Sequence, residues 1–384
     1  MRTLTFLQPQ RLTFGRGCVG EAIEYVRAKG FARVHVVGSP SQRETCERLR
    51  AELARGACVV TVDAATPPEP TIAAFRAALD RAREADAECV IGVGGGSPLD
   101  VAKLVAAFVR NGEQRVEESF GIGLLRGRAC HLVCLPTTSG TGSEVSPNAI
   151  LLDEAAQLKK GVISPFLVPD ATFIDPELTH SLPAFTTAAT GLDALTHCIE
   201  AYTNKFAHPL VDVYALEGVR LAALYLARAV RDGSDAEARE GMSRASLYGG
   251  LCLGPVNTAA VHALAYPLGG EFHVAHGLSN AVLLPAVFRF NAAAAPERHA
   301  DVALMLGAEF ASSAFETAMR GAERLEQLAA ECGIEIDLTK LGISRDAVPR
   351  MAASAMTVQR LLKNNPREVT QADAERLYRE CFRS

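Results

Sequence analysis

The apolar segment GLDALTHCIE, residues 191–200, carries two side chains that can bind a metal or move a proton. Its leucines and isoleucine recur at helical spacing, which predicts a buried helix face. Asp193 and His197 lie four residues apart, and residues at this spacing are neighbours on a helix. The sequence therefore predicts that a carboxylate and an imidazole point to one place in apolar surroundings.

A second apolar segment, VHALAYPLGGEFHVAHG (261–277), contains three of the nine histidines, His262, His273 and His276. A single histidine in an apolar helix is more often a hydrogen-bonded core residue than a ligand. Combined with the pair above, however, these imidazoles favour a divalent first-row metal, and both Fe²⁺ and Zn²⁺ suit such donors. HExxH and CxxC patterns are absent from the sequence, which argues against a metalloprotease or a zinc ribbon.

A glycine turn follows a predicted strand in CVIGVGGGSPLDVAKLVAAF (89–108). Without side chains at Gly95 and Gly96, the next helix can present bare N–H groups to an anion such as a pyrophosphate. Ser97 is predicted to be the N-cap, with Asp100 completing a capping box. The alternative interpretation is a tight turn without a ligand, since the run is not the G-x-G-x-x-G fingerprint.

A second polar turn, PTTSGTGSE (136–144), follows the next predicted strand. It offers the hydroxyls of Thr137, Thr138 and Thr141 beside two glycines. Two such turns at the C-terminal ends of neighbouring strands predict a ligand crevice at the switch point of a sheet.

The elements that must position these residues follow two patterns. In the first half of the chain, β-branched runs alternate with amphipathic helices, which is typical of a parallel sheet in βαβ units. The predicted strands are residues 33–37, 58–62, 89–93 and 131–135, and residues 148–164 are predicted to form a hairpin. From about Ala184 onward the pattern is helical. We therefore expect an α/β nucleotide-binding domain at residues 1–182 and an all-helical domain at residues 183–384.

Composition narrows the class of protein. A chain of 384 residues, with 48% hydrophobic and 22% charged residues, is expected to form more than one globular core. The net charge of −5 gives no reason to expect nucleic acid or an anionic membrane as a partner, and no apolar run is long enough to span a bilayer. The first residues lack the apolar block of a signal peptide, and ten scattered cysteines are typical of reduced thiols, so we expect a cytoplasmic protein.

Taken together, the motifs GGGSPLDVAK, PTTSGTGSE, GLDALTHCIEAY and HALAYPLGG…HVAHG resemble those of the group III, iron-containing alcohol dehydrogenases. The resemblance runs in order from about residue 5 to NNPREVT near the C-terminus. It implies a dehydroquinate synthase-like fold, with an α/β nucleotide-binding domain, an all-α metal-binding domain and an active site in the cleft between them. It also implies a homodimer, and the runs LTFLQP and RLTFG predict an edge hairpin suited to pairing.

The resemblance implies roles for particular residues of this chain. The metal ligands would be Asp193, His197, His262 and His276, with His273 left out of the ligand set. The cofactor residues would be Gly95, Gly96, Ser97, Asp100, Thr137, Thr138, Thr141 and Lys159. The substrate would be faced by Asn148, Asn257 and Thr258.

Three positions depart from patterns common in that family. Tyr266 replaces a histidine that many members carry near the nicotinamide, so the phenol is either the proton carrier or a packing residue. Ser39 follows the second strand, where relatives that prefer NAD often have an aspartate that repels a 2′-phosphate. Glu69 stands where some relatives have an asparagine near the cofactor. We therefore expect the chain to accept NAD or NADP.

The expected reaction is reversible hydride transfer between NAD(P)(H) and a short, oxygenated alcohol or aldehyde, with a divalent metal (Fe²⁺ first, Zn²⁺ second) acting on the substrate oxygen. A maleylacetate reductase-like enzyme is an alternative, although the paired histidines typical of that group are missing. A second alternative is an NAD-using carbon–oxygen lyase resembling dehydroquinate synthase, but residues 184–203 and 253–280 lack the lysines and arginines that such an enzyme needs. A third alternative is a non-catalytic metal or nucleotide sensor, but such a protein would not need both a metal site and a cofactor site.

Overall fold

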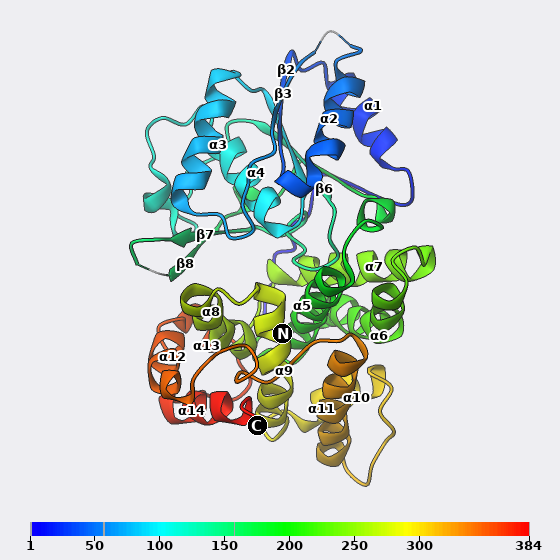
Figure 1. Cartoon of the computed structure of the whole chain (residues 1–384), viewed down its shortest axis with the longest axis vertical. Coiled ribbons are helices and arrows are strands. Elements are labelled where there is room, and N and C mark those ends of the chain that lie inside the picture. Colours follow the sequence, from blue (N-terminus) through cyan, green and yellow to red (C-terminus); the bar gives the residue numbers. More distant parts are fainter. Residues whose placement is uncertain (1, 57, 157, 384) are drawn as a thin grey trace. The chain divides into compact units, whose positions relative to one another are not determined.

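The computed structural model describes residues 2–56, 58–156 and 158–383, and it divides into two compact units (Figure 1). The first, here called the α/β unit, consists of Phe6–Thr138 and Gly142–Thr179. The second, the helical unit, contains the chain from His180 onward, together with residues 2–5 and Ser139–Thr141. The middle of the second polar turn therefore packs with the helices.

Six parallel strands form the main sheet of the α/β unit, in the order β1-β9-β6-β4-β2-β3. Parallel pairing agrees with the βαβ pattern of the sequence. The strands are β1 (Arg11–Phe14), β2 (Arg33–Val37), β3 (Val59–Asp63), β4 (Cys89–Gly94), β6 (His131–Pro136) and β9 (Ala171–Ile174). The helices between them are α1 (Val19–Lys29), α2 (Arg43–Leu53), α3 (Ile72–Glu84) and α4 (Gly96–Phe108).

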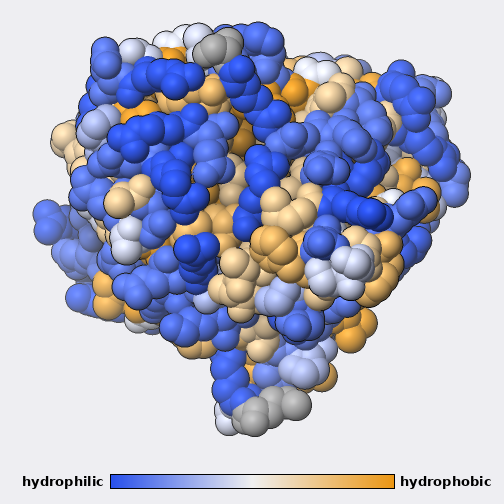
Figure 2. Space-filling view, turned by 90° about the horizontal axis from the view of Figure 1, so that it is seen from below, coloured by the Kyte–Doolittle hydropathy of each residue, from blue (hydrophilic) through white to orange (hydrophobic). Residues whose placement is uncertain are grey.

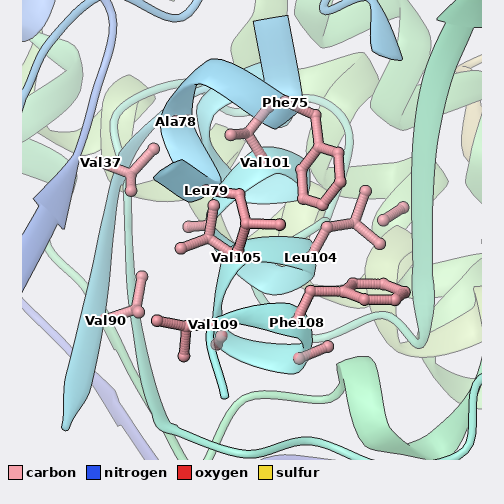
Figure 3. Close-up of a cluster of buried hydrophobic side chains, with 14 of the residues drawn as sticks. Val37, Phe75, Ala78, Leu79, Val90, Val101, Leu104, Val105, Phe108 and Val109 are labelled. Atoms are coloured by element: carbon pink, nitrogen blue, oxygen red, sulfur yellow. The ribbon is translucent and has the colours of Figure 1, made fainter. Parts of the chain in front are cut away.

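Helices cover both faces of this sheet, because successive strand residues point to opposite sides. On one face α3 and α4 pack against Val37 and Val90, and the rings of Phe75 and Phe108 meet edge to face with centroids 5.9 Å apart (Figure 3). On the other face lie α1 and α2. Coverage on both faces explains why β4 is buried along its whole length.

A smaller sheet has the order β5-β8-β7, from β5 (Gly121–Ile122), β7 (Asn148–Asp153) and β8 (Leu158–Ile163). Strands β7 and β8 are antiparallel, which confirms the hairpin predicted at 148–164.

The hairpin predicted at the N-terminus is wrong. Residues 2–10 form no strand, and β1 pairs in parallel with β9 at the edge of the main sheet. Pro9 lies where the chain would have to turn, and it fixes φ and lacks an N–H donor. A turn signal such as Asn-Gly is also missing there, so β1 finds its partner far along the chain.

The helical unit has no strand among its described residues. Its helices are α5 (Ala184–Tyr202), α6 (Pro209–Arg231), α7 (Ala236–Leu253), α8 (Ala260–Phe272), α9 (His276–Ala292), α10 (Pro296–Met305), α11 (Ala314–Glu331), α12 (Val348–Ala355), α13 (Gln359–Leu362) and α14 (Gln371–Glu380). One short 3₁₀ turn of this unit is η5 (Arg345–Ala347), whereas η1 (Pro40–Gln42), η2 (Val116–Ser119), η3 (Pro165–Leu167) and η4 (Pro176–Thr179) lie in the α/β unit. Helix α5 packs against α6, α7 and α9, which makes it the central helix of the unit.

The surface carries both hydrophilic and apolar side chains. Figure 2 shows a face on which hydrophilic side chains surround smaller apolar groups. Single exposed apolar residues, such as Val59 and Phe310, are normal for a folded protein. Among the described helices, none is long and apolar enough to cross a membrane.

Candidate functional site

Helix α5 places Asp193 and His197 side by side in the interior of the helical unit. The Nε2 atom of His197 lies 3.7 Å from Oδ1 of Asp193, as the spacing of the two residues predicts. Both side chains are buried, because α5 is covered along most of its length. A carboxylate in such a place needs compensating positive charge or hydrogen bonds.

Two further histidines reach the same carboxylate oxygen from α8 and α9. The Nε2 atoms of His262 and His276 lie 3.5 Å and 3.7 Å from Asp193 Oδ1. The rings of His197 and His262 stack with centroids 4.7 Å apart. One carboxylate oxygen therefore faces three imidazole nitrogens from three helices.

His273 lies outside this cluster. It ends α8 in the left-handed conformation, with φ of 55°, and its side chain is exposed. His276 instead begins α9, and the following Gly277 lets α9 approach α5 closely. A Cβ atom at Gly277 would lie 2.1 Å from the carbonyl oxygen of Ala189, so any larger residue would displace His276.

The donor set suits a divalent metal: donor atoms of Asp193, His262 and His276 lie within 4.8 Å of one another, and His197 approaches the same carboxylate oxygen from α5. Bonds of about 2.1 Å to Fe²⁺ or Zn²⁺ place the donors of a tetrahedral site roughly 3.4 Å apart. The three nitrogens lie 3.5–3.7 Å from the shared oxygen. Burial opposes ionisation of Asp193, but His197, His276 and His262 hold the pKa of its carboxyl well below the usual range. The carboxylate is therefore charged and able to bind a cation.

Glu200 contacts the cluster, although it was not among the residues predicted from the sequence. Its carboxylate accepts hydrogen bonds from Nδ1 of His262 and from the backbone N–H of Val261, each at 2.6 Å. Burial alone would lower the pKa of His262, but the charge of Glu200, followed by Asp193, raises it to about 9. Ligand histidines usually donate their second N–H to such a carboxylate, which directs the other nitrogen to the metal. The signal was a second carboxylate in GLDALTHCIE.

Asn280 was also missed, and its amide lies at the centre of the cluster. Its Nδ2 donates to Asp193 Oδ1 at 2.7 Å and lies 3.1 Å from Nε2 of His262 and 3.4 Å from Nε2 of His276. A hydrogen-bond donor is the neutral group that best suits a place surrounded by acceptors. Its position four residues after His276 was a signal visible in the sequence.

The glycine turn begins α4 in a different way from the prediction. Gly95, not Ser97, is the N-cap, and the Ser97 hydroxyl donates to the carbonyl of Pro68 in a distant loop. The Asp100 carboxylate accepts from the Ser143 hydroxyl and from the N–H of Ile150, so the predicted capping box does not form. These distant partners compete successfully with the local cap. The turn itself consists of glycines and so carries no side chains. Gly94 has φ of 147°, which a residue with a side chain rarely adopts.

The structure brings the two polar turns together. The N–H of Thr137 donates to the carbonyl of Gly94 at 2.9 Å. A Cβ atom at Gly95 would lie 3.1 Å from the side chain of Thr138. Thr141 belongs to the segment Ser139–Thr141, which packs with the helical unit. Two turns at the ends of adjacent strands β4 and β6 thus share one edge of the sheet, as expected for a ligand site.

Other predicted cofactor and substrate residues lie nearby in the α/β unit. Lys159 forms an ion pair with Glu69 at 2.7 Å, which links two of the positions singled out in the sequence. Asn148 starts β7, and its side-chain oxygen is buried without a hydrogen-bond partner among the described residues. The hydroxyl of Ser39 lies 2.9 Å from that of Ser41, after the end of β2.

The remaining predicted residues lie on or next to α8. Asn257 has φ of 76°, and its side-chain oxygen accepts from the N–H of Thr258 at 2.8 Å. Tyr266 lies one turn after His262, so both side chains share a face of the helix. The phenol oxygen accepts a hydrogen bond from Nη2 of Arg360 at 2.6 Å. Arg360 was not predicted, because it lies 94 residues further along the chain.

Comparisons with known proteins agree over nearly the whole chain. The family model "Iron-containing alcohol dehydrogenase" matches residues 9–176, and "Fe-containing alcohol dehydrogenase family, C-terminal" matches residues 187–382. Long-chain-alcohol dehydrogenase 1 of Geobacillus thermodenitrificans is 37% identical, over 96% of this chain and 94% of its own length. A solved 1,3-propanediol oxidoreductase is 32% identical, with a TM-score of 0.95 over 99% of this chain and 100% of its own. Sulfoacetaldehyde reductase from Bifidobacterium kashiwanohense, solved in complex with NAD⁺, is 27% identical, with a TM-score of 0.89 over 100% of both chains.

Proposed function

Because the chain belongs to the iron-containing alcohol dehydrogenase family, and is thus a metal-dependent nicotinamide oxidoreductase, we propose that it interconverts a short, oxygenated alcohol and its aldehyde. One observation carries the proposal: three imidazole nitrogens converge on a single buried carboxylate oxygen. The polar residues Asn257 and Thr258, just before α8, favour a short oxygenated substrate over a long alkyl chain. Relatives act on small alcohols and aldehydes, among them 1,3-propanediol and sulfoacetaldehyde.

Asp193, His197, His262 and His276 hold the divalent metal in this proposal. When bound, the metal supplies a Lewis acid for the substrate oxygen, and the nicotinamide supplies or accepts the hydride. Asp193 contributes negative charge to the ligand set. Glu200 accepts the hydrogen bond of the Nδ1–H of His262, so Nε2 is the nitrogen that would give up its proton to bind the metal. Tyr266 is the residue proposed to give a proton to the substrate oxygen or accept one from it.

The cofactor is proposed to lie along the edge formed by the two polar turns. Backbone N–H groups at Gly95, Gly96 and Ser97 receive the pyrophosphate. The side chains of Thr137, Thr138, Thr141 and Lys159 flank it. Asp100 acts indirectly in this proposal, because its carboxylate already binds Ser143 and Ile150 and fixes the second turn against the first. Ser39 leaves room for the 2′-phosphate, so NADP is accepted as well as NAD.

Assembly and location complete the proposal. Strand β1 is an edge strand, and we propose that a homodimer forms there about a two-fold axis. All ten cysteines are unpaired, which supports a reducing, cytoplasmic environment. The ligand set of three nitrogens and one oxygen suits both Fe²⁺ and Zn²⁺, and the family favours Fe²⁺ first and Zn²⁺ second.

The test is an assay with protein loaded with Fe²⁺ or Zn²⁺, with NADH or NADPH, and with a panel of short aldehydes. Oxidation of the cofactor that requires both metal and aldehyde supports the proposal. Turnover of maleylacetate alone selects a maleylacetate reductase-like enzyme. Tight cofactor binding without turnover of any carbonyl compound overturns the proposal in favour of a sensor.

A further inference from the structure

Arg360 is a half-buried cation that pairs with no acidic side chain in the part of the chain that the structure describes. It lies on α13, and its Nη2 donates to the phenol oxygen of Tyr266. Among the described residues it forms no ion pair with an aspartate or glutamate, whereas Arg350 on the neighbouring α12 pairs with Glu271. Placing a guanidinium where water is partly excluded costs free energy unless an anion or acceptors compensate it.

The position of Arg360 is tied to the face of α8 that carries the metal ligand. Tyr266 lies four residues after His262, which is about 6 Å along a helix. The end of α13 is anchored to the start of α8, because the Asn364 amide donates to the carbonyl of Thr258 at 2.8 Å. The guanidinium is therefore held against Tyr266, the residue one helical turn after the ligand candidate His262.

We infer that the substrate of the proposed reaction is an aldehyde that carries an oxyanion, and that Arg360 binds this group. The guanidinium offers five N–H donors in a planar fork that matches carboxylate, sulfonate or phosphate oxygens, and Tyr266 accepts a hydrogen bond from only one nitrogen. Residues 253–280 contain no lysine or arginine, and Arg350 is paired with Glu271, so Arg360 supplies an uncompensated positive charge beside α8.

The reaction leaves the oxyanion unchanged. In the reductive direction a hydride from NAD(P)H forms the new C–H bond at the carbonyl carbon, and the carbonyl oxygen takes up one proton. The products are the hydroxy anion and NAD(P)⁺. This inference rests on the proposed function, and it adds the charge of the substrate and the residue that recognises it.

The experiment compares matched pairs of aldehydes: succinic semialdehyde with butanal, and glyceraldehyde 3-phosphate with glyceraldehyde. The wild type is expected to favour at least one anion over its neutral partner, and the better pair distinguishes carboxylate from phosphate. Arg360→Gln should lower the kcat/KM ratio of anionic to neutral substrate roughly 10–100-fold, the value of a charged hydrogen bond. Arg360→Lys should fall between the two, and the control Arg350→Gln should leave the ratio unchanged.

Equal losses for both members of a pair, or a wild type that favours the neutral aldehydes, would overturn the inference. Calorimetric titration with succinate separates this failure from failure of the proposed function. If no aldehyde is reduced, the proposed function is wrong, while succinate binding that Arg360→Gln abolishes still supports the anion site. If succinate does not bind the wild type either, the anion site is wrong as well.

Discussion

The helical unit and the α/β unit each bury a cluster of charged side chains, but the two clusters are satisfied in different ways. In the α/β unit, fully buried Lys103 donates to the carbonyls of Ser146 and Asn148 at 2.9 Å and 2.7 Å, and it lies 4.0 Å from Asp100. In the helical unit, one oxygen of Asp193 is surrounded by imidazole nitrogens. The first cluster is complete by itself, whereas the second gains most from a cation.

The comparison distinguishes buried charges that hold the fold together from buried charges that bind a ligand. A charged residue in an apolar segment marks either role, and GGGSPLDVAK and GLDALTHCIE both contain such residues. The two segments differ in the partners of their charges. In the first, the partners are mainly backbone groups that the charge holds in a turn. In the second, they are side-chain nitrogens that point to one place. The predictions below test this distinction.

The largest effect is expected for the ligands of the helical unit. His197→Ala should remove the metal and lower kcat by at least ~10³-fold, because the donor set loses one of its four members. Elemental analysis and steady-state kinetics measure the two losses. His273→Ala is the matched control and should keep its metal. A metal-free preparation that turns over at the full rate would contradict the prediction, and so would a His197→Ala protein that no longer binds cofactor.

In the α/β unit, Lys103→Met should reduce the free energy of unfolding without removing the metal. The substitution leaves the Asp100 carboxylate without its cation and two carbonyls without their donor, a loss of about 3–5 kcal/mol. Thermal unfolding and metal analysis of the same preparation check both parts. Loss of metal at temperatures where the fold is intact would show that the two clusters are coupled, contrary to the comparison.

These two clusters also show how far the sequence could predict the site. Asp193 and His197 were predictable because their relation is local, at one helical turn. Recruitment of His262 and His276 came from the family resemblance, since spacing cannot say which helices will meet. Glu200 stood in the same segment, but its partner lies 62 residues away on another helix.

The errors of sequence reasoning share this cause. Ser97 has the local chemistry of an N-cap, yet a carbonyl 29 residues earlier takes its hydroxyl. Asp100 fits a capping box, yet Ile150 and Ser143 take its oxygens. The sheet and the helical half were predictable because periodicity is local. Choices among distant hydrogen-bond partners were not.

A third prediction uses pH to test the buried charges of the α/β unit. Burial raises the pKa of Glu144 to about 7 from 4.5, although Lys103 partly opposes the shift. Between these values the folded protein binds a proton that the unfolded chain has released, so stability falls as pH rises through this window and levels off above about pH 7. The span is on the order of 3 kcal/mol.

Glu144→Gln removes this titration. The variant should therefore gain stability relative to the wild type as pH rises, which denaturant unfolding at about pH 5 and about pH 8 measures. Parallel profiles of the two proteins would mean that Glu144 is ionised in the folded state.

A smaller effect is expected for Glu200, which touches a ligand but not the metal. Glu200→Gln keeps the size of the side chain and removes its charge, and metal affinity should fall roughly 10–100-fold. Competition with a chelator measures this directly. Glu177→Gln in the α/β unit is a control that should have no effect. An unchanged metal affinity would mean that Glu200, like Lys103, only stabilises the fold.

The smallest effect on activity is expected at Ser39, which belongs to neither cluster of buried charges. Ser39 is half-buried just after β2, and its hydroxyl shares a hydrogen bond with that of Ser41. An aspartate here would accept hydrogen bonds from the ribose 2′-OH of NAD and repel the 2′-phosphate of NADP. Because solvent partly screens the position, the repulsion should be worth about 1 kcal/mol, or roughly five-fold. Ser39→Asp should therefore shift the ratio of kcat/KM for NADH over NADPH by that factor while leaving metal content unchanged, and Ser41→Asp is the matched control.

If the ratio does not move, or if the wild type rejects NADPH by several orders of magnitude, Ser39 does not lie at the adenosine ribose. The α/β unit would then select its cofactor through other residues, such as the ion pair of Lys159 with Glu69.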